Sequence, residues 1–107
     1  MEAKMALSYR YWATFRLKQN PTWQKRYTSL GLAFDKVGSR FWQEPTSFVA
    51  FNSVQVLENV ARILKPALDP NVDLLVLALS DTSSCCYIGT PDNAAVFKHH
   101  FPFAKKV

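Results

Sequence analysis

The feature that most constrains this chain is an apolar run that follows a tight turn. The turn from Asp69 to Asp73, Asp-Pro-Asn-Val-Asp, leads directly into Leu74–Leu79, in which every residue is apolar. An apolar run of this length without alternation is typical of a central strand covered on both faces. If helices cover only one face of the sheet, the other cover has to come from another chain. The run therefore predicts a central strand and gives a first indication of a dimer.

Residues 9–17 alternate between two faces, which is the period of a β-strand. One face has Tyr9, Tyr11, Ala13, Phe15 and Leu17, and the other has Arg10, Trp12, Thr14 and Arg16. The first set is apolar throughout, so it predicts the face that packs on the core. Pro21 lies in the break that follows the strand.

The next segment has the period of an amphipathic helix. Trp23, Tyr27, Leu30, Phe34 and Val37 are spaced four, three, four and three residues apart, which places them on one side of a helix. We expect Thr22 as its N-cap and Gly38 as its C-terminal cap. Lys25, Arg26 and Lys36 are predicted to point away from the apolar stripe.

Two short strands and a second helix are predicted after Gly38. Residues 40–43 and 47–51 indicate strands separated by Pro45, which cannot donate a hydrogen bond to a ladder. Asn52 or Ser53 is then expected to cap a helix, whose inner stripe is Leu57, Val60, Ala61 and Leu64. Pro66 ends that helix.

The order of these elements is strand, helix, strand, strand, helix, strand. It predicts an α+β, ferredoxin-like β-α-β-β-α-β sandwich, with two helices on one face of an antiparallel sheet. Residues 85–88 add a possible fifth edge strand. We expect a single domain over residues 1–107, with a core at about 9–89 and a weakly patterned, partly mobile tail at 94–107.

Composition narrows the class of protein. The 107 residues carry a net charge of +5, from 13 Lys and Arg against 8 Asp and Glu. A basic excess suits contact with nucleic acid or another anionic surface. No apolar run approaches the roughly 20 residues that span a bilayer, and the two adjacent cysteines make no disulfide framework. We expect a soluble, cytoplasmic protein that does not bind a membrane.

Several of these segments resemble the small proteins labelled SinR-family and, more distantly, the CRISPR-associated Cas-two and VapD group. The similarity covers about residues 9–89: the tyrosine-rich first strand, the helix ending at Gly38, Arg40-Phe41-Trp42, residues 47–51 and, most specifically, Leu-Asp-Pro-Asn-Val-Asp-Leu-Leu-Val from Leu68 to Val76. The resemblance implies a ferredoxin-like protomer in a two-fold dimer with sheets face to face. The fifth strand often reaches the partner.

In the Cas-two and VapD relatives an aspartate that ends the first strand is associated with metal-dependent cleavage of nucleic acid. Arg16 stands in that neighbourhood here. A divalent metal needs oxygen ligands, and a guanidinium group supplies none and repels the ion. We expect that Arg16 marks a lost active site rather than a relocated one, with no catalytic residue, no bound metal and no cofactor.

The polar face of the first strand is the main candidate site. The pattern favours a dimer interface, in which Trp12 buries area and Arg10 and Arg16 pair with acids of the partner. The alternative is that the two arginines contact phosphates while a base stacks on Trp12. Lys18, Lys25 and Arg26 extend the basic surface, or form an ordinary solvated helix face. Any binding of RNA or DNA by this surface should weaken with salt.

Other candidates have structural interpretations. Cys85 and Cys86 are expected on opposite faces of an edge strand, and His99 and His100 in a polar tail. Asp69 and Asp73 are expected to stabilise a turn, and Asp81 ends the central strand. The sequence thus favours a non-catalytic, homodimeric binding or regulatory domain, with nucleic acid as a candidate partner. A metal-dependent endoribonuclease and a protein–protein interaction module are the alternatives.

Overall fold

The computed structural model describes residues 8–80 and 84–107. Within these residues the elements in chain order are β1 (Tyr9–Arg16), α1 (Trp23–Val37), β2 (Ser39–Trp42), β3 (Phe48–Ser53), α2 (Leu57–Leu64), the short 3-10 helix η1 (Lys65–Ala67), β4 (Leu74–Leu79), β5 (Cys85–Gly89), α3 (Ala94–His100) and β6 (Lys105–Lys106). The α+β class predicted from the periodicity is confirmed.

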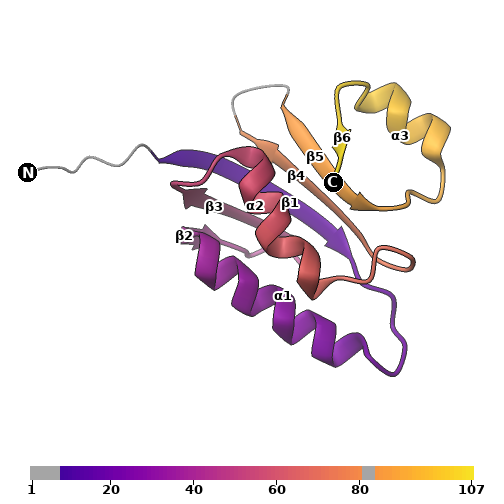
Figure 1. The fold of residues 1–107 in the computed structure, drawn as a ribbon, viewed down its shortest axis with the longest axis horizontal. Helices are drawn as coiled ribbons and strands as arrows, with labels where there is room; N and C mark the ends of the chain where they lie inside the picture. The colour runs from indigo at the N-terminus through magenta and orange to yellow at the C-terminus, as the bar shows by residue number, and fades with distance from the viewer. Residues whose placement is uncertain (1–7, 81–83) are drawn as a thin grey trace, which may run out of the picture.

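The strands form one sheet in the order β2-β3-β1-β4-β5-β6 (Figure 1). β1 pairs antiparallel with β3 on one side and with β4 on the other, so the first strand of the chain lies inside the sheet. The prediction of a purely antiparallel sheet is wrong at one end, because β5 and β6 are parallel. β5 is therefore not an edge strand, since β6 pairs with its outer side.

Helices α1 and α2 lie on one face of the sheet and enclose the main core (Figure 1). The alternation of β1 is confirmed, because Tyr11 and Ala13 are buried on this face whereas Arg10 and Thr14 are exposed. The core set is Tyr11, Ala13, Leu30, Phe34, Val37, Val49, Phe51, Val60, Ala61, Leu64, Ala67, Leu68, Leu75, Leu77, Cys86 and Ile88. Most of these residues lie in the segments where periodicity predicted apolar faces.

The opposite face of β4 and β5 is covered by the C-terminal part of the same chain. Val76, Ala78 and Cys85 form a second buried cluster there, and Phe97 and Phe101 pack against it. The prediction that helices lie on one face only is therefore wrong, because α3 lies on the other. The reasoning that β4 needs a second chain as its cover is wrong for the same reason.

The helix termini differ from the prediction in detail. Thr22 occupies the N-cap position of α1, but its side chain makes no capping hydrogen bond. Asn52 and Ser53 belong to β3, so neither caps α2. Gly38 follows α1 in extended geometry, with φ −135°, so no left-handed cap forms. A Cβ atom at Gly38 would lie 2.7 Å from Cδ2 of Phe51, so close packing on the core restricts this position to glycine.

Candidate nucleic-acid interface

Strands β2, β3 and β1 present three aromatic side chains on the face opposite α1 and α2. Trp12 and Trp42 each pair with Ala50 across the sheet, and Phe48 lies beside them, opposite Thr14. The Trp12 and Phe48 rings are stacked, with their centroids 6.1 Å apart and their planes 16° from parallel. The Trp42 ring meets the Phe48 ring edge-on, with 6.0 Å between the centroids. Trp12, Phe48 and Trp42 are called the aromatic patch below. Trp42 is 47% exposed, whereas Trp12 and Phe48 are half-buried, and Trp12 also packs against the second buried cluster.

Local backbone geometry turns Trp42 onto this face. The register between β2 and β3 shifts between Ser39 and Trp42, and Arg40 has a positive φ of 55°. Such an irregularity redirects the side chains that follow it. The indole Nε1 of Trp42 then donates a hydrogen bond of 2.8 Å to Glu44, which fixes the ring beside Phe48.

Arg10 and Arg16 lie at the two ends of β1 on the same face as Trp12. Arg10 is exposed opposite Asn52 of β3. Arg16 is half-exposed and donates from Nη1 to Oδ2 of Asp92 at 2.8 Å. Because Asp92 is itself highly exposed, this ion pair is hydrated and contributes little to stability. A phosphate group can compete with Asp92 for this guanidinium.

The region around Arg16 is hollow and basic. A cavity of about 550 Å³ is lined by Arg16, Lys18, Asn71, Val72, Thr90, Pro91 and Asp92. This is the neighbourhood in which the sequence resemblance predicts a lost acidic residue. Among residues 8–80 and 84–107 no cluster of three His, Cys, Asp or Glu side chains could hold a metal ion. Asp81 lies outside the described residues.

Arg26 does not belong to the exposed basic surface, and the prediction that it points away from the core is wrong. Its guanidinium group is nearly buried and pairs with Asp73. It also donates to the carbonyl of Lys18 at 2.9 Å and to Oδ1 of Asn20 at 2.6 Å. Lys18 and Lys25 are exposed as predicted. Arg26 is therefore a structural residue that joins the start of α1 to the turn before β4.

Asp73 completes that arrangement. Its side chain is fully buried and accepts hydrogen bonds from the backbone N–H groups of Lys18 and Asp69, at 3.0 and 2.9 Å. Asp69 in turn accepts from the N–H of Asn71 at 3.1 Å. The turn-stabilising role predicted for both aspartates is confirmed. Both carboxylate oxygens of Asp73 are thus used within the fold.

The remaining sequence candidates lie elsewhere. Cys85 and Cys86 are free thiols on opposite faces of β5, one in each buried cluster, as predicted. Burial raises the pKa of both thiols, which makes them poor nucleophiles. His99 and His100 are exposed at the end of α3. The segment predicted as a mobile tail contains α3 and β6.

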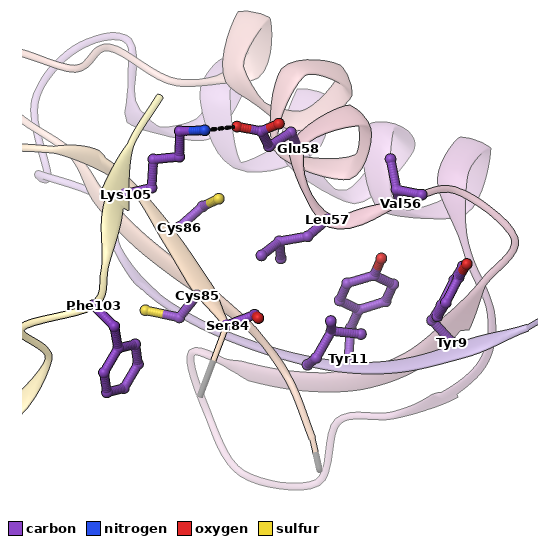
Figure 2. Close-up of a pocket in the computed structure, with 11 residues that line it drawn as sticks. Tyr9, Tyr11, Val56, Leu57, Glu58, Ser84, Cys85, Cys86, Phe103 and Lys105 are labelled. Carbon is purple, nitrogen blue, oxygen red and sulfur yellow. Dashed lines mark ion pairs between the residues drawn. The ribbon is translucent and has the colours of Figure 1, made fainter. Parts of the chain in front are cut away.

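A second hollow lies between the start of α2 and strands β5 and β6. This pocket, called the α2–β6 pocket below, has a volume of about 420 Å³ and is lined by Tyr9, Tyr11, Val56, Leu57, Glu58, Leu79, Ser84, Cys85, Cys86, Phe103 and Lys105. Figure 2 shows Lys105 and Glu58 joined as an ion pair across one side of it. The Cys86 sulfur lies on the same side as this pair, whereas the Cys85 sulfur points toward Phe103.

The contribution of Tyr11 to the stability of the fold depends on pH. Its hydroxyl donates to the carbonyl of Gln55 at 2.6 Å, and burial raises its pKa from 10.0 to about 12. The unfolded chain therefore ionises Tyr11 at lower pH than the folded chain does. We expect the contribution of Tyr11 to stability to be complete below pH 10 and lost as pH rises to about 12. Urea unfolding of wild type and Tyr11→Phe across this range checks it, because the variant should lack that part of the pH slope.

Sequence reasoning identified Trp12 but not its two aromatic neighbours. Phe48 and Trp42 were placed in strands, and only the register of those strands brings the three rings together. The α2–β6 pocket joins residues from opposite ends of the chain, such as Tyr9 and Lys105, and no local signal marks it.

No family model matches this chain, and neither a curated protein nor a solved structure matches it significantly. Among the described residues no helix is both long and apolar enough to cross a membrane.

Proposed function

We propose that this protein is a non-catalytic, cytoplasmic binding domain of the ferredoxin-like, Cas-two-like kind, and that it contacts single-stranded nucleic acid through the aromatic patch. The observation that carries the proposal is the position of Trp12, Phe48 and Trp42 beside one another on the sheet face opposite α1 and α2, with Arg10 and Arg16 on the same face. Exposed aromatic rings on such a face offer stacking platforms to unpaired bases. Basic groups beside them contact the phosphates.

Charge and geometry support this function. Arg10 and Arg16 are six residues apart on one strand, so about 20 Å of sheet separates their Cα atoms. That length spans more than one nucleotide, so two phosphates can be contacted while bases stack between them. The net charge of +5 favours association with a polyanion.

The strand arrangement supports the ferredoxin-like part of the proposal. The four strands β2-β3-β1-β4 lie in that order with antiparallel neighbours, and a helix follows each of β1 and β3. This is the arrangement expected when two split β-α-β units interlock. A two-fold dimer and a relationship to the SinR-family proteins remain part of the proposal.

Fluorescence anisotropy with labelled 12-nucleotide poly-U and poly-dT tests the binding. We expect Trp42→Ala and Trp12→Ala each to weaken binding by about 5- to 150-fold, which corresponds to the roughly 1–3 kcal/mol of one base–aromatic stack. Arg10→Gln should reduce the slope of log K against log salt by about 0.7, the single-strand value for one phosphate contact. The matched controls are Trp23→Ala and Lys25→Gln on α1, which should leave affinity unchanged.

Three results contradict the proposal. Equal effects of Trp42→Ala and Trp23→Ala would show that the patch is not the binding surface. Cleavage of the oligonucleotide in magnesium or manganese, absent in chelator, would favour the nuclease alternative. A dimer by light scattering that Trp12→Asp dissociates, without any oligonucleotide binding by either form, would make the patch a protein interface.

A further inference from the structure

The α2–β6 pocket is separate from the aromatic patch. Tyr9 and Tyr11 alternate with Arg10 and Trp12 along β1, so they point to the helix side of the sheet while the patch lies on the other side. Its volume of about 420 Å³ is within the range of about 300–1,000 Å³ that small-molecule sites occupy. A ligand here would leave the patch open.

The body of the pocket is mainly apolar and carries no charged side chain. Tyr9, Leu57, Leu79 and Phe103 supply hydrocarbon and ring surface. The Tyr11 hydroxyl is already used as a donor to Gln55. These groups suit an apolar side group, and the polar atoms beside them are the hydroxyls of Tyr9 and Ser84.

The side of the pocket toward β6 has one charge of each sign. Lys105 and Glu58 form an ion pair. The hydrogen bond between the two side chains raises the pKa of Lys105 and lowers the pKa of Glu58, so both groups stay charged. The Lys105 side chain is 67% exposed and that of Glu58 39%, so the pair is hydrated and costs little to separate. Figure 2 shows the two side chains reaching toward each other from β6 and α2.

A ligand that carries an ammonium and a carboxylate close together satisfies both charges at once. We propose that the α2–β6 pocket binds a free α-amino acid with an apolar side chain. Its carboxylate takes the place of Glu58 at Lys105, and its ammonium takes the place of Lys105 at Glu58. Its side chain lies in the apolar body against Leu57 and Leu79, which both lie on the helix side of the sheet. A simple anion or cation would leave one of the two protein charges without its partner.

Calorimetry and amide chemical shifts with L-phenylalanine and L-leucine test the ligand class. We expect saturable binding with Kd of about 1 mM or tighter, given the small number of atoms in these ligands. N-acetyl-L-phenylalanine lacks the ammonium and 2-phenylethylamine lacks the carboxylate, so each should bind at least about 10-fold more weakly. Glycine, without an apolar side group, should also bind weakly.

Variants locate the site. Val56 lines the pocket and is 52% exposed, so Val56→Trp should fill the pocket without disturbing the core and abolish binding. Val54 is 57% exposed and does not line the pocket, which makes Val54→Trp the matched control. Lys105→Gln should weaken binding about 10-fold, whereas its exposed neighbour Lys106→Gln should not.

Each outcome decides the proposal. No saturable response to either amino acid at 10 mM, a concentration about tenfold above the expected Kd, would overturn it. Equal binding of the two analogues would show an apolar site without zwitterion recognition, which also contradicts it. Equal losses in Val56→Trp and Val54→Trp would place binding elsewhere. Oligonucleotide affinity should be unchanged in Val56→Trp, so this proposal and the nucleic-acid proposal fail independently.

Discussion

Asp73→Ala is expected to destabilise the protein by about 3–5 kcal/mol, because it leaves the Arg26 guanidinium buried without its counter-charge. The backbone N–H groups of Lys18 and Asp69 lose their acceptor as well. A loss of this size is a large part of the stability of a domain of this length. Urea unfolding monitored by tryptophan fluorescence measures it directly.

Two further variants test whether the loss of stability comes from the burial of the Arg26–Asp73 ion pair. Asp92 also pairs with an arginine, but it is highly exposed, so Asp92→Ala should cost about 1 kcal/mol or less. The double variant Asp73→Leu with Arg26→Met removes both charges and should recover part of the lost stability. If Asp73→Ala costs no more than Asp92→Ala, the Arg26–Asp73 pair does not hold this part of the fold.

Gly89→Ala is the second substitution with a large expected effect. Gly89 has φ +100°, and a Cβ atom there would lie 1.9 Å from the carbonyl oxygen of Asp73. Gly89 also pairs with Leu74 at the end of β5, so neither backbone can move without disturbing the β4–β5 ladder. We expect a loss of more than about 4 kcal/mol, or no folded protein.

Gly31 provides the control for that substitution. It lies in α1, and nothing lies within 4 Å of the Cβ that alanine would add. Gly31→Ala should therefore stabilise the protein by about 0.5–1 kcal/mol, the helix preference of alanine over glycine. Thermal unfolding of the two variants tests both the expected loss of stability in Gly89→Ala and the expected gain in Gly31→Ala. A tolerated Gly89→Ala would contradict the close approach of β5 to the turn before β4.

Local periodicity was sufficient to predict the elements that carry the main core. The alternation of residues 9–17 and the helical spacing from Trp23 to Val37 each report burial on one face, and both elements formed. The same spacing failed at the start of α1, where Tyr27 is 48% exposed. The core does not extend that far, and the rings of Trp23 and Tyr27 pack on each other instead, with 5.3 Å between their centroids.

Features made by residues distant in sequence were not predictable. Arg26 looked like a surface cation because its partner, Asp73, is 47 residues away. The cover over β4 was assigned to another chain because α3 has no clear apolar stripe, although Phe97 and Phe101 reach the sheet. The aromatic patch depends on strand register, and register follows from pairing rather than from composition.

The place of β1 inside the sheet has a consequence for synthesis on the ribosome. It is the first strand of the sheet to be made, yet one of its edges pairs with β4, which begins only at Leu74. Until β4 emerges, that edge has unpaired backbone donors and acceptors, although β3 can already occupy the other edge. Completion of the sheet therefore waits for the last third of the chain. The growing polypeptide depends on rapid late pairing to avoid contact with other nascent strands.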